Sequence, residues 1–191
     1  IMDRWSGRLT PDELRKEFRD FKLKVINEDI VFNITNESIS KLKKELKFIK
    51  DTFEDDDIIT GSIALKLFGL LDRDCDDIDI LIKDKDRYTG YDNDVYSDSN
   101  INIPNRLGYL DFSYKPYFFS KTKKYEVDFF EDHGCNFTEL EIGGGGLEDN
   151  LIRIHNPIEI IDFKMKLAID GKIDKHNEDL TKIFVGTPEF I

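Results

Sequence analysis

Two aspartates, Asp77 and Asp79, form the pattern in this sequence that most directly predicts chemistry. They lie in the stretch Asp-Ile-Asp-Ile-Leu-Ile, which begins with the alternation of a half-buried β-strand. Side chains two residues apart on a strand point to the same face, so the two carboxylates are expected to project together. Mg²⁺ prefers such oxygen ligands and usually takes one or two protein carboxylates plus substrate phosphates. The same alternation is also compatible with a strand that has one solvent-exposed face.

A glycine-serine pair, Gly61-Ser62, favours a phosphate site. It follows a predicted short strand that begins at Ile58 and precedes a helix predicted to end near Leu70. Glycine lets the backbone approach a phosphate closely, serine offers a hydroxyl, and a helix start offers free N–H groups. The alternative is that Ser62 serves only as a helix N-cap.

A third acid, Asp128, lies within an otherwise apolar strand predicted over residues 125–130. It could join the first two carboxylates if the strands were neighbours. The alternative is an edge strand on which Glu126 and Asp128 both face water.

Several cations and histidines are weaker candidates. Arg73, Lys164 and Lys166 could reach a phosphate, although ordinary surface positions fit these side chains as well. His176 and Asp179 are predicted to be an exposed polar pair rather than a nucleotide contact.

Known phosphate and calcium motifs do not fit. The glycines 143–146 are followed by Leu147 and Glu148, where a P-loop needs Lys and Ser or Thr. An EF-hand beginning at Asp72 would need Gly at position 77 and Glu at position 83, and the sequence has Asp77 and Lys83.

Helices and strands must position these residues. Thr10 and Glu13 form a capping box ahead of a helix that extends to about Val25. The remaining predicted elements are a helix over 37–53, strands over 110–119 and 125–130 joined by residues 120–124, a strand over 151–155, and helices over 157–168 and 175–184.

Composition limits the classes of function. The 191 residues include 28 Lys and Arg against 40 Asp and Glu, a formal charge of −12, which argues against broad non-specific affinity for nucleic acid. Two cysteines, Cys75 and Cys135, form no disulfide framework and no zinc-site spacing, so a cytoplasmic protein is expected. No apolar run approaches the ~20 residues needed to cross a bilayer, so no membrane association is expected.

The chemistry-bearing segments resemble a known signature. Its two parts are Ile59-Thr60-Gly61-Ser62-Ile63-Ala64-Leu65 and Arg73-Asp74-Cys75-Asp76-Asp77-Ile78-Asp79-Ile80. Together they resemble the DNA polymerase β-type nucleotidyltransferase superfamily, most closely small prokaryotic and phage members such as the AbiEii-type toxins. Cys75 stands where these members commonly have Thr, and the spacer from Ser62 to Asp77 is slightly long. The resemblance covers about residues 57–82, 123–131 and 157–184.

The resemblance implies a fold and a set of roles. The fold would be α+β, a small mixed sheet flanked by helices, with an N-terminal helical segment (1–56), a core (57–156) with an insertion over 83–109, and C-terminal helices (157–191). Asp77 and Asp79 would hold two Mg²⁺ ions on a nucleoside triphosphate, and Asp128 would ligate the second ion and help deprotonate an acceptor hydroxyl. Gly61 and Ser62 would bind the β- and γ-phosphates.

The implied reaction moves a nucleoside monophosphate from the triphosphate to an acceptor hydroxyl and releases pyrophosphate. The acceptor could be tRNA, a protein or a small molecule, and a toxin-type enzyme could have an antitoxin partner. The alternative is a catalytically inactive member that binds a nucleotide or a protein partner.

Overall fold

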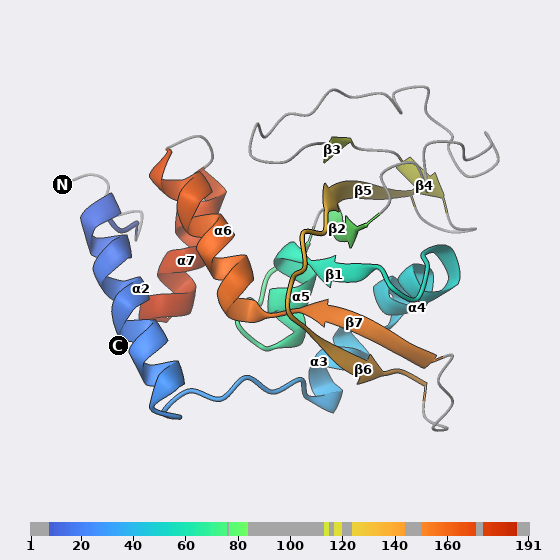
Figure 1. Cartoon of the computed structure of the whole chain (residues 1–191), viewed down its shortest axis with the longest axis horizontal. Coiled ribbons are helices and arrows are strands. Elements are labelled where there is room, and N and C mark those ends of the chain that lie inside the picture. Colours follow the sequence, from blue (N-terminus) through green and yellow to red (C-terminus); the bar gives the residue numbers. More distant parts are fainter. Residues whose placement is uncertain are drawn as a thin grey trace.

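The computed structural model describes residues 8–75, 77–83, 113–114, 117–119, 124–143, 150–170 and 174–186 (Figure 1). The helices are α2 (Pro11–Ile26), α3 (Asn36–Lys41), α4 (Lys43–Thr52), α5 (Gly61–Leu67), α6 (Pro157–Ile169) and α7 (Asp174–Val185). The strands are β1 (Ile58–Thr60), β2 (Asp77–Ile82), β3 (Ser113–Tyr114), β4 (Tyr117–Phe119), β5 (Lys124–Glu131), β6 (Phe137–Glu141) and β7 (Leu151–His155).

The strands form one mixed sheet in the order β3-β5-β2-β1-β7-β6, with β4 also paired to β5. The pairs β2–β5 and β1–β7 are parallel, whereas β1–β2 and β6–β7 are antiparallel. Helices flank this sheet, so the expected α+β architecture is confirmed.

The strand expected over 110–119 is divided into β3 and β4. Both are antiparallel to β5 in one continuous register, because Ser113 pairs with Phe130 and Phe119 pairs with Lys124. Residues 110–112, 115–116 and 120–123 lie outside the described part of the chain. Strand β5 is therefore an interior strand between β2 and the β3–β4 pair, which rules out the edge-strand interpretation of Asp128.

One face of the sheet packs on α4 and α5 through alternating apolar residues. The isoleucines at 78, 80 and 82 of β2 are at most 3% exposed, and Phe129 on β5 is fully buried. Phe53, just after α4, meets Phe129 edge to face at 5.8 Å between ring centroids. Since neighbours along a strand alternate, the aspartates of β2 project from the opposite face.

The helices follow the expected pattern except at one point. The Thr10–Glu13 capping box begins α2 as predicted. The prediction of a single helix over 37–53 is wrong, because the helix is interrupted at Leu42, where α3 ends and α4 begins. Leu42 is 3% exposed and joins Leu46 and Ile49 in the core, so these apolar side chains are buried on both sides of the break.

A second group of helices, α2, α6 and α7, lies at one end of the sheet (left in Figure 1). Phe184 of α7 stacks on Phe18 of α2 at 5.9 Å and lies 5.5 Å from Phe21. The Asn177 side chain also accepts from the Leu9 N–H at 3.2 Å and donates to the Leu9 carbonyl at 2.8 Å. The N-terminal helix thus holds α7 in place.

Other expectations have mixed outcomes. Strand β7 and helices α6 and α7 agree with prediction within about one residue, while β6 was not predicted. The insertion expected over 83–109 lies outside the described residues apart from Lys83. None of the described helices combines the length and the apolar character that crossing a membrane requires.

Candidate metal and phosphate site

Three carboxylates converge on the polar face of the sheet. Asp77 and Asp79 come from β2 and Asp128 from β5, and one oxygen of each lies within 4.8 Å of the others. Asp128 is 8% exposed, and the other two side chains are partly buried. The predicted acid trio is therefore assembled.

The parallel register explains why they meet. Asp79 is the direct partner of Asp128, and Ile80 is the partner of Phe129. Because partners in a parallel pair share a face, the two acids lie side by side while Ile80 and Phe129 fill the core behind them. Carboxylates this close repel one another, and a bound cation lowers that repulsion.

Gly61 lies against this cluster, where a larger residue would displace the Asp79 side chain. Its φ is +69°, a conformation that favours glycine, and an added Cβ would lie 2.9 Å from Asp79 Cγ and overlap the carboxylate. The glycine thus allows the start of α5 to approach Asp79. A direct approach of Gly61 to a phosphate remains a prediction.

Ser62 is the next residue, and its hydroxyl points to a guanidinium. Arg73 Nη2 donates to Ser62 Oγ at 2.8 Å. The interpretation of Ser62 as an N-cap is wrong, because Thr60 occupies that position, and the Thr60 hydroxyl bonds to His155 instead of capping the helix.

Arg73 belongs to a buried ion network centred on Asp179 of α7. Its Nε and Nη2 donate to the two oxygens of Asp179, both at 2.7 Å, and Lys164 Nζ of α6 donates to Oδ2 at 3.1 Å. Asp179 is 1% exposed, and the side chains of Lys164 and Arg73 are 6% and 19% exposed. Asp179 therefore fixes the position of Arg73, and Arg73 in turn orients the Ser62 hydroxyl.

Burial and charge shift the acid–base properties of this network. Burial by itself would raise the pKa of Asp179, but the hydrogen bonds from Arg73 and the charge of Lys164 outweigh it and lower that pKa. Burial lowers the pKa of Lys164, and Asp179 opposes this change. Burial, reinforced by Lys164, lowers the pKa of His176 to about 4.

These positions correct two expectations. The exposed pair predicted for His176 and Asp179 is wrong, since Asp179 is among the most buried polar groups described. Lys164 is not an ordinary surface lysine. Lys166 is an ordinary surface lysine, because its side chain is 65% exposed and its Nζ lies 3.5 Å from Asp162 Oδ2. A phosphate contact for Lys166 stays a prediction.

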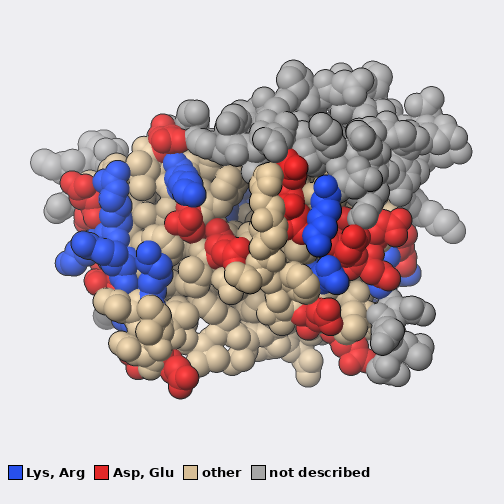
Figure 2. All heavy atoms as spheres, viewed as in Figure 1, with Lys and Arg blue, Asp and Glu red and all other residues tan. Residues whose placement is uncertain are grey.

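Surface charge on the face shown in Figure 2 is mixed. Among the described residues drawn there, Lys and Arg gather most densely over α2 at the left, whereas at the centre and right acidic side chains lie among fewer Lys and Arg. This distribution places the basic surface of that face over the N-terminal helix.

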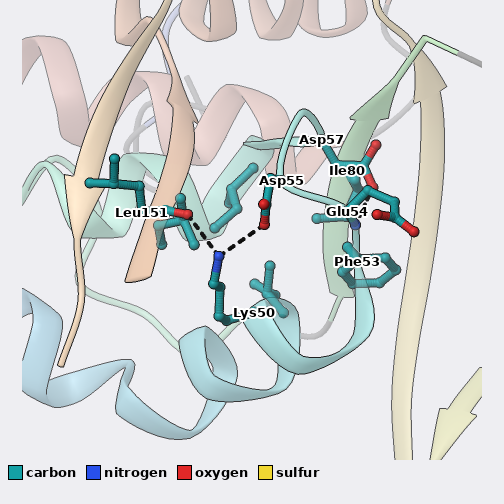
Figure 3. A pocket seen from close by; sticks show the side chains of 10 residues that line it. Lys50, Phe53, Glu54, Asp55, Asp57, Ile80 and Leu151 are labelled. Carbon is teal, nitrogen blue, oxygen red and sulfur yellow. Dashed lines mark hydrogen bonds and ion pairs between the residues drawn. The ribbon is translucent and has the colours of Figure 1, made fainter. Parts of the chain in front are cut away.

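A separate hollow lies on the other face of the sheet (Figure 3). Its apolar lining includes Ile49, Ile59 and Ile80. At its rim Lys50 Nζ donates to Asp55 at 2.9 Å and to the Leu151 carbonyl at 3.2 Å. This lysine ties α4 to β7, and the hollow is distinct from the carboxylate cluster.

Comparison with known proteins gives no match: no protein-family model, no curated protein and no solved structure is similar to this chain at a significant level. The function of this protein must therefore be inferred from the geometry of the carboxylate cluster and the residues around it.

Proposed function

We propose that this protein is a metal-dependent nucleotidyltransferase that transfers a nucleoside monophosphate from a nucleoside triphosphate to an acceptor hydroxyl, with release of pyrophosphate. The observation that carries the proposal is the convergence of Asp77, Asp79 and Asp128 beside Gly61-Ser62. The resemblance of the same residues to a nucleotidyltransferase signature supports it.

The carboxylate cluster suits Mg²⁺. All three ligands are oxygens, and their mutual distances within 4.8 Å allow shared coordination of hard cations. Asp77, Asp79 and Asp128 would hold one or two ions. When bound, Mg²⁺ would neutralise phosphate charge and act as a Lewis acid at the reacting phosphorus.

The surrounding side chains have complementary roles. Ser62 accepts its hydrogen bond from Arg73, so its own O–H is left to donate to a phosphate oxygen. Arg73 is committed to Asp179 and Ser62 and acts as a positioning residue. Asp128, the most buried of the three acids, would accept the proton of the acceptor hydroxyl.

The chemistry of the acceptor is less constrained. The formal charge of −12 disfavours a long nucleic-acid footprint but leaves room for a local contact with tRNA. A protein or a small molecule with a free hydroxyl is equally compatible with the site, so the assay must offer all three.

The test is transfer of labelled α-phosphate from each of the four nucleoside triphosphates into total tRNA, total protein and small molecules of a cell extract. We expect one class to be labelled in the presence of Mg²⁺ and none after chelation. Asp79→Asn and Asp128→Asn should abolish labelling. Asp162→Asn is the matched control, because this aspartate is 53% exposed on α6.

Thermal melting separates catalysis from binding alone. A catalytically inactive protein would be stabilised by Mg²⁺ and a triphosphate without labelling any acceptor. Absence of both labelling and stabilisation would refute the nucleotide site itself.

A further inference from the structure

A second cluster of metal-ligating side chains lies at the end of β7, which β1 separates from β2 and its carboxylates. Cys135 follows β5, His155 ends β7, and Glu159 belongs to the first turn of α6. One ligand atom of each lies within 4.8 Å of the others. Cys135 and His155 are 20 positions apart in the sequence, which is why no spacing motif predicts the group.

Hydrogen bonds hold Cys135 and Glu159 in position. The Asp132 Oδ1 atom accepts from the Gly134 and Cys135 N–H groups at 2.9 and 3.0 Å, which fixes the turn that carries the thiol. The Asn136 N–H donates to the Glu159 carboxylate, at 3.2 Å from one oxygen and 3.3 Å from the other. The thiol and the carboxylate are thus positioned by the backbone of the same connection.

The Thr60 hydroxyl orients the imidazole of His155, the third ligand of the cluster. His155 Nδ1 lies 2.8 Å from Thr60 Oγ1, so the hydroxyl can accept the Nδ1 proton and leave the Nε2 lone pair facing the cluster. His155 Nε2 lies 3.3 Å from Glu159 Oε1, a distance at which the two atoms can share either a hydrogen bond or a cation. Two ligands at about 2.0–2.1 Å in a tetrahedral zinc site are separated by about 3.3 Å.

We propose that Cys135, His155 and Glu159 bind a divalent cation of the zinc class. Sulfur, nitrogen and oxygen ligands together suit Zn²⁺, whereas the all-oxygen cluster suits Mg²⁺. Glu159 is 34% exposed, which leaves solvent access for a water as the fourth ligand. The cation would fasten the β5–β6 connection to the start of α6.

A nucleophilic role for Cys135 fits less well. Burial, reinforced by Asp132, raises the pKa of this thiol to about 11 and so disfavours a free thiolate, whereas a divalent cation bound beside it would displace the proton. The cation site also stands apart from the proposed transferase, because it requires none of the three aspartates.

The test is a titration of the metal-free full chain with Co²⁺ in the presence of excess Mg²⁺, which keeps the oxygen cluster occupied. We expect a thiolate-to-cobalt charge-transfer band that saturates at one equivalent and disappears when Zn²⁺ is added. Cys135→Ser should lose the band. Cys75→Ser, which changes the other cysteine of the chain, should keep it.

Melting provides an independent readout. Zn²⁺ at a hundredfold excess over its Kd should raise the Tm of the unmodified chain by about 5–10 °C. The rise should be much smaller in Glu159→Gln, a variant that keeps the shape of the side chain. The proposal is overturned if the intact chain gives no band, if Cys135→Ser keeps it, if Cys75→Ser loses it, or if Zn²⁺ stabilises all variants equally.

Discussion

Replacing Asp179 with asparagine tests the buried ion network most directly. The change removes the charge that lies between Arg73 and Lys164 while keeping the size of the side chain. Lys164, with a side chain only 6% exposed, would lose its hydrogen-bonded counter-ion inside the protein. Breaking such a buried pair by removing one partner costs about 3–5 kcal/mol.

For a chain of this size, each kcal/mol shifts Tm by about 2–4 °C, so we expect Asp179→Asn to lower Tm by about 6–20 °C. Urea unfolding at neutral pH gives the free energy directly. Asp162→Asn on α6 removes a carboxylate that is 53% exposed and should change stability by no more than about 0.5 kcal/mol.

A double variant, Asp179→Asn with Lys164→Met, separates charge burial from loss of packing. It should recover part of the lost stability, because the buried ammonium is gone. A loss below about 1 kcal/mol for Asp179→Asn, or an equal loss in the Asp162 control, would refute the reasoning.

Three further outcomes are expected. Gly61→Ala should lower the free energy of unfolding by about 1–2 kcal/mol because of its backbone conformation, and it should also abolish stabilisation by Mg²⁺ because the new methyl displaces Asp79. The control is Gly69→Ala, which has φ +74° and open space around it. In melts with and without Mg²⁺, this control should show only the backbone cost. The depressed pKa of His176 means that the unfolded chain binds a proton that the folded chain does not between about pH 6.5 and 4, so stability should fall as pH falls through this window, and urea titrations should show a shallower fall in His176→Asn. Thr60→Val leaves a buried imidazole nitrogen without its partner and should cost about 1–3 kcal/mol by urea unfolding; a neutral effect would contradict the hydrogen bond.

The acid trio could be anticipated because its signal is local on each strand. Asp77 and Asp79 share a face whatever the rest of the fold does, and Asp128 interrupts an apolar run. Their meeting could only be expected by resemblance, since the parallel pairing of β2 with β5 depends on tertiary structure.

The ion network of Arg73, Lys164 and Asp179 could not be anticipated from a local sequence pattern. Asp179 lies 106 positions from Arg73 in the sequence. It ends the polar stretch 174–179, whose composition is typical of an exposed helix surface. Its burial depends on how α6 and α7 pack beside the sheet. Strand β6 was missed because most of its residues are exposed, so its hydrophobic pattern is weak.

The long separation between Arg73 and Asp179 has a consequence for the newly made chain. At about 5–20 residues per second, a ribosome needs about 5–20 s to synthesise the 106 residues between them. During this interval the Asp179 carboxylate, which accepts two hydrogen bonds from Arg73 in the finished fold, has not yet been made. The nascent protein can therefore contain Asp77, Asp79 and Asp128 before Asp179 exists, and the phosphate-binding role proposed for Ser62 would begin only once α7 has emerged and docked.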